Sequence, residues 1–504
     1  MDIMRRRQSW LRWTATSLWL AVVASAFPPG GFGRQMEQVQ PVDWARFAAA
    51  TGVRSNDTFG QTLTSVLQNE ARYELRWVAA EQTLVTNLPG WEGLECYPPR
   101  FDAYNYECAV RPLTGFAYGM AALLKTGIYS PAAGGLSRAD ALHRTELAIR
   151  GVAFTHIVNT PSDYGGHRWG QGAAQSWEAA YWCAQAAQAA WWLWGDLSPQ
   201  TRRAVAKMVE HDADAFITMN VPYWADKQGK IVTPGDTKAE ENAWNSLLLA
   251  SAQAMMPQHP RVEKWRQKAS EYQISAYSRQ SDLTNSTLVD GKPAKDWLQG
   301  YNVFADGVLV NHNRVHPDYM LAQETCFASL VAVSLARQYI PQSMVFNAGV
   351  AYRALTEVQF TPGADTKYGT GKAFTAPGGT IYFRTADGGY SADTYYPQGS
   401  DWTTKITDGY LNMDLAAAQL GFDAGKPFSA LGWATARAQT LLALQNRAGH
   451  DGNIYQPGDW TAKYRGTDEL IFQSNAQAWM QGWLMQNHLM SPVGDHWGPV
   501  RGGG

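Results

Sequence analysis

The segment from Asn302 to Met320 carries the residue types that proteins use most often for acid–base chemistry. It contains His312, His316 and Tyr319. Its other polar residues are Asn311, Asn313, Arg314 and Asp318. Asp306-Gly307 is a turn signal, and a helix is expected from Leu321 onward, so the polar cluster falls in a loop. Because loops on a rigid scaffold often carry catalytic groups, we predict a functional loop, with structural histidines as the alternative.

A second polar segment runs from Thr233 to Ser246. Asn242 and Asn245 are three residues apart, which places them on one face of an expected helix, beside Glu241 and Trp244. Asparagine is a poor helix former, so the pair indicates a polar site at a helix start. The alternative is a solvated first turn. Thr237 and Glu240 match the S/T-x-x-E capping box, which would give Glu240 a structural task.

Together the two segments offer the groups needed to eliminate across a uronate glycosidic bond. Removing the proton α to the sugar carboxylate creates an enolate-like charge, which Asn, His or Arg can stabilise. His or an ionised Tyr can take that proton, and a Tyr hydroxyl can protonate the leaving oxygen. Asn242, His312 and Tyr319 form one such set. This chemistry requires neither a metal nor a cofactor, and we expect none.

The order of these motifs resembles that of the toroidal polysaccharide lyases. Asp306-Gly-Val-Leu-Val-Asn-His312, with Tyr319 following, is similar to the Asp-Gly-Ser-Phe-x-Gln-His pattern of hyaluronate and chondroitin lyases. Those enzymes also carry a C-terminal β-sandwich domain, whereas here helices are expected to about His488. The chain therefore looks more like the single-domain lyases of glucuronan or alginate, such as polysaccharide lyase family 38. The resemblance implies that Asn242 neutralises the carboxylate, His312 or Tyr319 is the base, and Tyr319 is the acid.

Further segments could bind the sugar around this set. In Gly165–Gly172, His167 and Arg168 could hold a carboxylate while Trp169 stacks on a ring. Tyr396 and Trp402 lie in an aromatic loop that could wall a subsite. Ordinary inter-helix loops are the alternative for both. The predicted substrate-binding residues are His167, Arg168, Trp169, Glu241, Trp244, Asn245, Arg314, His316, Tyr396 and Trp402.

The elements that must position these residues are predicted to be almost entirely helical. The expected helices lie near residues 60–85, 112–126, 137–159, 177–194, 237–256, 260–278, 320–340, 342–358, 408–420, 428–446 and 468–489. A further helix is expected to start at Ser198-Pro199, with apolar residues on one face as far as Phe216. Residues 362–400 form a small β/loop insertion, with Thr380–Arg384 as a possible strand. We predict an all-α fold, an (α/α) toroid of about six to seven helix pairs, because stacked pairs bury a core of this size. Separate helical domains are the alternative.

Composition and the N-terminus restrict the class of protein. The formal net charge of −2 excludes a nucleic-acid protein that relies on bulk charge, and 45% hydrophobic residues exclude disorder. The 22 Trp fit either a sugar-stacking cleft or helix packing. Residues 1–26 resemble a signal peptide, with a retained anchor as the alternative. Residues 27–504 would then be one catalytic domain, secreted or periplasmic and monomeric, with no stable membrane insertion.

The four cysteines add one further expectation. Cys96 and Cys108 flank a Tyr-rich and Pro-rich loop, where an exported protein could form a disulfide. Cys183 and Cys326 lie in apolar stretches and are expected to be buried thiols. The chain has no CxxC motif, so a cysteine metal site is not expected.

Two other functions remain open at this stage. A toroidal glycoside hydrolase needs two carboxylates, and Asp236, Glu240, Glu241 and Asp306 are candidates. A non-catalytic glycan-binding protein needs only the aromatic cleft. The His, Tyr and Asn set favours a lyase acting on a uronate polysaccharide.

Overall fold

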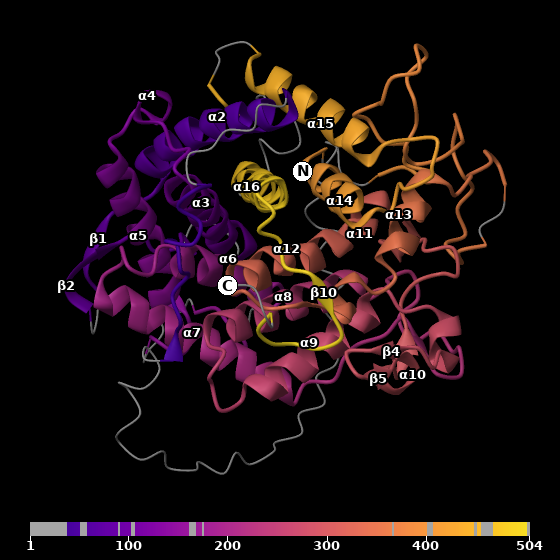
Figure 1. Ribbon diagram of the computed structural model, residues 1–504, viewed down its shortest axis with the longest axis horizontal. Helices are drawn as coiled ribbons and strands as arrows, with labels where there is room; N and C mark the ends of the chain where they lie inside the picture. The colour runs from indigo at the N-terminus through magenta and orange to yellow at the C-terminus, as the bar shows by residue number, and fades with distance from the viewer. Residues whose placement is uncertain are drawn as a thin grey trace, which may run out of the picture.

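The chain is mostly helical, with small two-stranded sheets (Figure 1). The computed structural model describes residues 38–50, 58–88, 91–101, 106–160, 168–173, 176–364, 367–400, 407–447, 451–454 and 467–500. Its longer helices are α2 (Thr58–Glu81), α3 (Tyr106–Thr126), α5 (Arg138–Thr155), α6 (Ala179–Trp192), α7 (Pro199–Ile217), α8 (Ala239–Met255), α9 (Val262–Ala276), α12 (Ala322–Leu335), α13 (Ala348–Thr356), α14 (Thr407–Leu420), α15 (Ala430–Gln445) and α16 (Thr467–Gln486).

These helices match the ranges expected from hydrophobic periodicity. Several also begin where local sequence chemistry requires. Ser137, Ser198 and Ser429 are N-caps, and each hydroxyl accepts a hydrogen bond from the backbone N–H three residues later. Pro199 follows Ser198 at the first helical position, where its missing N–H costs nothing. The predicted all-α class is therefore confirmed, apart from the small sheets.

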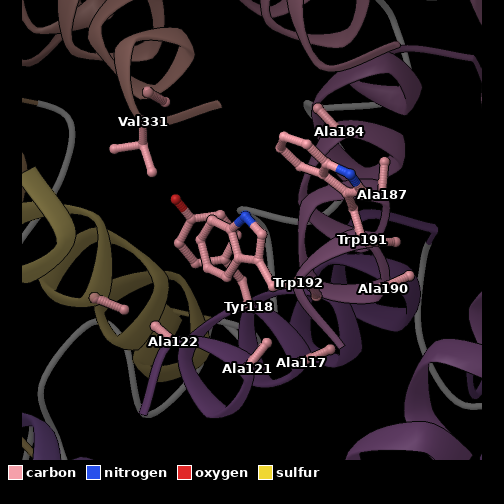
Figure 2. Close-up of a cluster of buried hydrophobic side chains, with 14 of the residues drawn as sticks. Ala117, Tyr118, Ala121, Ala122, Ala184, Ala187, Ala190, Trp191, Trp192 and Val331 are labelled. Carbon is pink, nitrogen blue, oxygen red and sulfur yellow. The ribbon is translucent and has the colours of Figure 1, made fainter. Parts of the chain in front are cut away.

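The core is built on helices that are apolar on every side. Every residue of α6 is buried, which its run of Ala and Trp allows. Tyr118 of α3 packs against Trp192 of α6 with ring centroids 4.7 Å apart, beside Val331 of α12 (Figure 2). Many of the 22 Trp thus serve helix packing. The alanines between the large rings let neighbouring helices approach closely.

The buried helices contact one another in a cyclic order. α3 packs against α6, α6 against α8, α8 against α12, α12 against α14, α14 against α16, and α16 against α3. Figure 1 shows α16 lying between α3 and α14. Second helices pack outside this series, with α5 on α3, α7 on α6, α9 on α8, and α15 on α14. α2 contacts both α15 and α16.

The connections between helices carry short strand pairs and helical turns. The antiparallel pairs are β1 (Val85–Leu88) with β2 (Trp91–Cys96), β3 (Ala225–Asp226) with β6 (Gly300–Tyr301), β4 (Leu288–Val289) with β5 (Lys292–Pro293), and β7 (Val310–Asn311) with β8 (Arg314–Val315). β9 (Ile340–Pro341) pairs in parallel with β10 (Val493–Gly494). The short helices are α4 (Pro131–Gly134), α10 (Ala294–Trp297), α11 (Pro317–Met320), η2 (Gln280–Thr284) and η3 (Gln342–Val345).

The insertion near residues 362–400 is a loop rather than a sheet. The expected strand Thr380–Arg384 does not form in the described structure, where Arg384 makes only an isolated bridge to Tyr390. Side chains from the neighbouring helices hold the loop in place. Arg437 of α15 donates to Ala392 O at 2.6 Å and to Asp414 of α14 at 2.8 Å, with its guanidinium fully buried. The ion pair joins α14 to α15, and the hydrogen bond to Ala392 O holds the insertion against them.

Other expectations are corrected or fall outside the described residues. The capping box at Thr237 and Glu240 is wrong, because α8 begins at Ala239 with no side-chain cap. Cys96 and Cys108 are free, buried thiols, so no disulfide joins them. The predicted signal peptide, His167 and Trp402 lie outside the described residues. None of the helices searched within the described residues is long and apolar enough to cross a membrane.

Candidate active site

The helices that form the cyclic series open on a cavity of about 190 Å³ at their N-terminal ends. Residues from the first turns of α3, α6, α8, α12, α14 and α16, or from just before them, line its wall. Each helix N-terminus presents unpaired N–H groups and a partial positive charge. Six such termini around one cavity favour a ligand that carries negative charge or hydrogen-bond acceptors.

One wall of the cavity is aromatic. Trp244 of α8 stacks on Tyr181 of α6, with ring centroids 6.2 Å apart and planes at 28°. Trp177 stands edge-on to Trp244 at 5.6 Å and is 53% exposed, which is unusual for so large an apolar side chain. The prediction that Trp244 lies at the site agrees with this placement. Aromatic faces open to a polar cavity are suited to the apolar face of a sugar ring.

Carboxylic acids at the same helix ends make the rest of the cavity lining acidic. Six line the cavity, and five of these stand at the N-cap or in the first turn of five different helices: Glu107 (α3), Glu178 (α6), Glu240 (α8), Glu324 (α12) and Asp408 (α14). Acidic residues stabilise helix N-termini, which accounts for part of this pattern. Their convergence on one cavity is a separate fact, because most first turns open to solvent.

Burial raises the pKa of most of these acids. It raises the pKa of Glu178 to about 7 and of Asp408 to about 6. It also raises the pKa of Glu240 and of Glu324 well above the usual range, and neighbouring carboxylates add to both shifts. The cause is the loss of water around the charged form together with repulsion between like charges. Glu178, Glu240, Glu324 and Asp408 therefore keep their protons to a higher pH than ordinary carboxylic acids do.

The candidate base lies on the β7–β8 hairpin. The two-residue turn consists of His312 and Asn313, and both have positive φ, at 49° and 56°. Positive φ at both turn residues is typical of a tight hairpin turn, which normally uses Asn-Gly. A histidine in this left-handed conformation costs roughly 1–2 kcal/mol. Strain of this kind is more common at functional sites than elsewhere.

The hairpin is fixed against the segment that leads into α8. The N–H of Asn313 donates to Gly235 O at 2.9 Å, and the N–H of Thr237 donates to Val310 O at 2.8 Å. The approach is close, since a Cβ on Gly235 would lie 3.1 Å from the Asn313 side-chain oxygen. The two polar segments that the sequence singled out are therefore packed together.

His312 and Tyr319 are in direct contact. His312 Nε2 lies 3.1 Å from the Tyr319 hydroxyl, within hydrogen-bonding distance. Tyr319 lines the cavity, whereas His312 is exposed and does not line it. The fully buried His316 packs edge-on against the Tyr319 ring with centroids 4.7 Å apart. This contact places His316 where it can orient Tyr319, which the sequence allows for His316 beside substrate binding.

Asp318 links this loop to the 367–400 insertion. Its Oδ1 accepts a hydrogen bond from the Tyr396 hydroxyl at 2.7 Å and another from the Tyr410 hydroxyl at 2.9 Å. Burial and the Asp318 charge raise the pKa of both tyrosines. Tyr396 is thus close to the cavity through Asp318, but its hydroxyl is already engaged and the ring does not line the cavity.

Several predicted residues lie elsewhere. Asn242 is fully buried, donates from Nδ2 to Pro222 O at 3.0 Å and does not line the cavity, so its expected neutralising role is not supported. Trp169 is fully buried, with its indole N–H donating to Val152 O at 3.0 Å, so the expected stacking on a sugar is wrong in this structure. The half-buried residues Arg168, Glu241, Asn245 and Arg314 also do not line the cavity.

Of the six acids of the cavity, the sequence analysis named Glu240 and Asp318 and missed the other four. They are scattered over some three hundred residues, from Glu107 to Asp408, and no local motif connects them. The usable signal was an acid at or near the start of one buried helix after another. That signal becomes informative only once the helices are known to lie side by side with the same orientation.

A separate cluster could hold a metal ion. Ligand atoms of His156, His211 and Asp212 lie within 4.8 Å of one another. Without an ion, Asp212 Oδ1 accepts from both imidazoles, at 3.0 and 2.9 Å, and from the N–H of Gln171. His156 Nδ1 accepts from the N–H of Val158, which leaves its proton on Nε2. These hydrogen bonds explain the cluster as a structural one, and they lower the pKa of Asp212 to about 2.

Comparisons with protein-family models, curated proteins and solved structures found no match to this chain.

Proposed function

We propose that this protein is a polysaccharide lyase that cleaves a uronate-containing polymer by β-elimination. One observation carries the proposal: the His312–Tyr319 pair, 3.1 Å apart, at a cavity with an aromatic wall. A base and a hydroxyl in contact can move a proton between them during a reaction. The backbone strain at His312 supports a role beyond folding.

The proposed scaffold is an (α/α) toroid of the kind found in the toroidal polysaccharide lyases. The cyclic order of contacts from α3 through α16 and back to α3 supports it. The second helices packed outside that series also support it. In such a fold the inner helices run parallel, and their N-termini collect at one end. The cavity at six helix N-termini agrees with that arrangement.

The proposed reaction needs only proton transfers. His312 takes the C5 proton directly, or it takes the Tyr319 proton so that the phenolate oxygen removes the C5 proton. The electrons of the C–H bond form the C4–C5 double bond, and the bond to the leaving oxygen breaks. The Tyr319 hydroxyl then protonates that oxygen. The order of these transfers depends on which face of the sugar meets Tyr319.

The walls of the cavity suit such a substrate. Trp177, Tyr181 and Trp244 provide surfaces for sugar rings. The helix N-termini provide positive potential for a carboxylate. We further propose an exported monomer with residues 27–504 as the catalytic domain.

A glycoside hydrolase is the second candidate, because the cavity holds acids with raised pKa values. A general acid needs a pKa near the working pH, and Glu178 meets that condition. The pair foreseen from the sequence is less suitable. Asp236 and Glu241 both bind Lys238, at 2.6 and 3.1 Å, and Asp306 binds Lys367 at 2.9 Å. Of the four residues, only Glu240 lines the cavity.

The experiment that tests the proposal incubates the protein with a panel of uronate polymers in the absence of added metal. Elimination leaves a double bond conjugated to the carboxylate, which absorbs in the ultraviolet. Hydrolysis produces new reducing ends without that absorbance. Binding without turnover would instead support a glycan-binding protein.

A further inference from the structure

The proposed elimination requires a group that neutralises the sugar carboxylate, and the residues expected to do so lie elsewhere. The Asn242 amide is buried against Pro222, and Arg168 does not line the cavity. Among the described residues that line it, Arg111 is the one cation. Arg111 is already bound to Glu107 at 2.9 Å, with Glu178 at 3.8 Å. Another donor is therefore needed for an anionic sugar.

Glu178 has the geometry for that task. It lines the cavity, yet only 8% of its surface is exposed, and its Oε2 has no hydrogen-bond partner among the described residues. A buried carboxyl oxygen without a partner carries a substantial desolvation cost, which a ligand could relieve. Glu178 also adopts positive φ, at 57°, directly before α6, and it makes no capping hydrogen bond there. The Glu178 side chain therefore does not cap α6, the helix that it precedes.

Burial favours the protonated form of Glu178, Glu107 adds to that effect, and Arg111 opposes it. Glu107 and Arg111 face the cavity from α3, and Tyr181 faces it from α6. Glu240 comes from α8, and Asp318, Tyr319, Glu324 and Asp408 come from α11, α12 and α14. Six acids and one guanidinium line the cavity, so ionising every acid at once would place like charges close together at high cost. Burial is the largest of these effects and raises the pKa of Glu178 to about 7.

We propose that Glu178 binds the carboxylate of a uronate in its protonated form and donates its hydrogen to that carboxylate. The proposal rests on the proposed lyase function and adds a catalytic residue to it. The hydrogen bond strengthens as negative charge builds up on the carboxylate oxygens during proton removal. A buried carboxylic acid that stays neutral to donate a hydrogen bond is a known way to stabilise an enolate. Arg111 Nη1 lies 3.8 Å from Glu178 Oε1 and balances the shared charge.

The test compares kcat/KM against pH for the wild type, Glu178→Gln and Glu178→Leu. The wild type should lose activity above about pH 7, by about tenfold per pH unit, as Glu178 gives up its proton. Glu178→Gln keeps a neutral donor, so its activity should stay within about tenfold of the wild type at pH 6 and show no such decline. Glu178→Leu cannot donate and should lose about 10²–10³-fold relative to the wild type at pH 6, and this difference should shrink above pH 7 as the wild type itself loses the donor. Glu263→Gln, an exposed acid bound to Arg266, is the matched control and should behave like the wild type.

Two results would overturn this inference while the lyase function stands. One is a Glu178→Gln variant that declines with pH as the wild type does. The other is a Glu178→Gln variant that is inactive at every pH while the wild type forms unsaturated product. If the wild type forms only saturated reducing ends, the lyase function fails, and the role of Glu178 in it fails as well.

A second measurement needs no variant and is useful if substitution of Glu178 prevents folding. Glucuronate has no glycosidic bond to eliminate, so it serves as a non-reacting probe for the wild-type protein. Calorimetric titration at about pH 8, in buffers of different ionisation enthalpy, counts the protons exchanged. Uptake of about one proton per glucuronate bound is expected, since binding requires protonated Glu178. Binding without proton uptake would overturn the inference.

Discussion

Replacing Tyr319 with phenylalanine removes one oxygen atom from the candidate site and leaves the ring in place. The ring contacts His316 edge-on with centroids 4.7 Å apart, and phenylalanine can keep that contact. The hydroxyl meets His312 in an exposed hydrogen bond, and such a bond contributes about 0.5–1.5 kcal/mol to stability. For a chain of this size we expect the melting temperature to fall by no more than about 2 °C.

The effect on turnover should be far larger. If Tyr319 is the acid, its loss should lower kcat by about 10²–10⁴-fold, because that is what a positioned proton donor contributes. This loss corresponds to about 3–5 kcal/mol of transition-state stabilisation. His312 and Tyr319 act on the same proton, so the double variant Tyr319→Phe/His312→Asn should be little worse than either single variant.

The assay follows the rise in ultraviolet absorbance with a uronate polymer, alongside thermal melting of the same samples. Tyr339→Phe is the matched control, since Tyr339 packs on His496 and does not line the cavity. A Tyr319→Phe variant that keeps more than about a tenth of wild-type kcat would refute the assignment of Tyr319 as the acid. If the losses in kcat from the two single substitutions multiply in the double variant, His312 and Tyr319 do not act as a pair.

Three further outcomes are expected. His312→Asn should keep the hairpin, because asparagine tolerates the left-handed conformation, but should lower kcat at least about 100-fold; unchanged kcat with an unchanged melting curve would exclude His312 from the reaction. Arg437→Met should cost about 3–5 kcal/mol in urea unfolding because it leaves Asp414 buried without its cation, and a cost below about 1 kcal/mol would contradict the role given to this ion pair. The pKa values of Glu178 and Asp408 are raised by folding to about 7 and about 6, so protonation of these acids stabilises the folded state. This stabilisation is complete below about pH 4 and is lost as the pH rises through 6 to 7. The loss is of the order of 3 kcal/mol for each acid. The double variant Glu178→Gln/Asp408→Asn should therefore unfold with a weaker dependence on pH between about 5 and 8, and an unchanged dependence would contradict the raised values.

The helices could be predicted from the sequence because each is specified locally. Ser198-Pro199 starts α7, and an uninterrupted run of Ala and Trp predicts a buried α6. The contact between His312 and Tyr319 could also be predicted from the sequence, since both residues lie in one short loop. Local chemistry is sufficient for features of this kind.

Features that depend on the packing of distant segments could not be predicted. The Asn242 side chain turns to Pro222, and nothing in its own helix specifies that direction. Trp169 resembled a sugar platform in a Gly-rich loop, yet His156 and Val152 bury it. Glu178 and Asp408 are acids of one cavity only because α6 and α14 start at the same end of the molecule. The sequence alone gives no relation between them.

The central claim is that the cavity catalyses elimination from a uronate polymer. The most direct measurement incubates the wild-type protein with uronate polymers and records both ultraviolet absorbance and reducing ends. We expect each new reducing end to be accompanied by one unsaturated uronate, and we expect Tyr319→Phe to abolish both signals. New reducing ends without the absorbance would contradict the account and would support hydrolysis by the acids of the cavity.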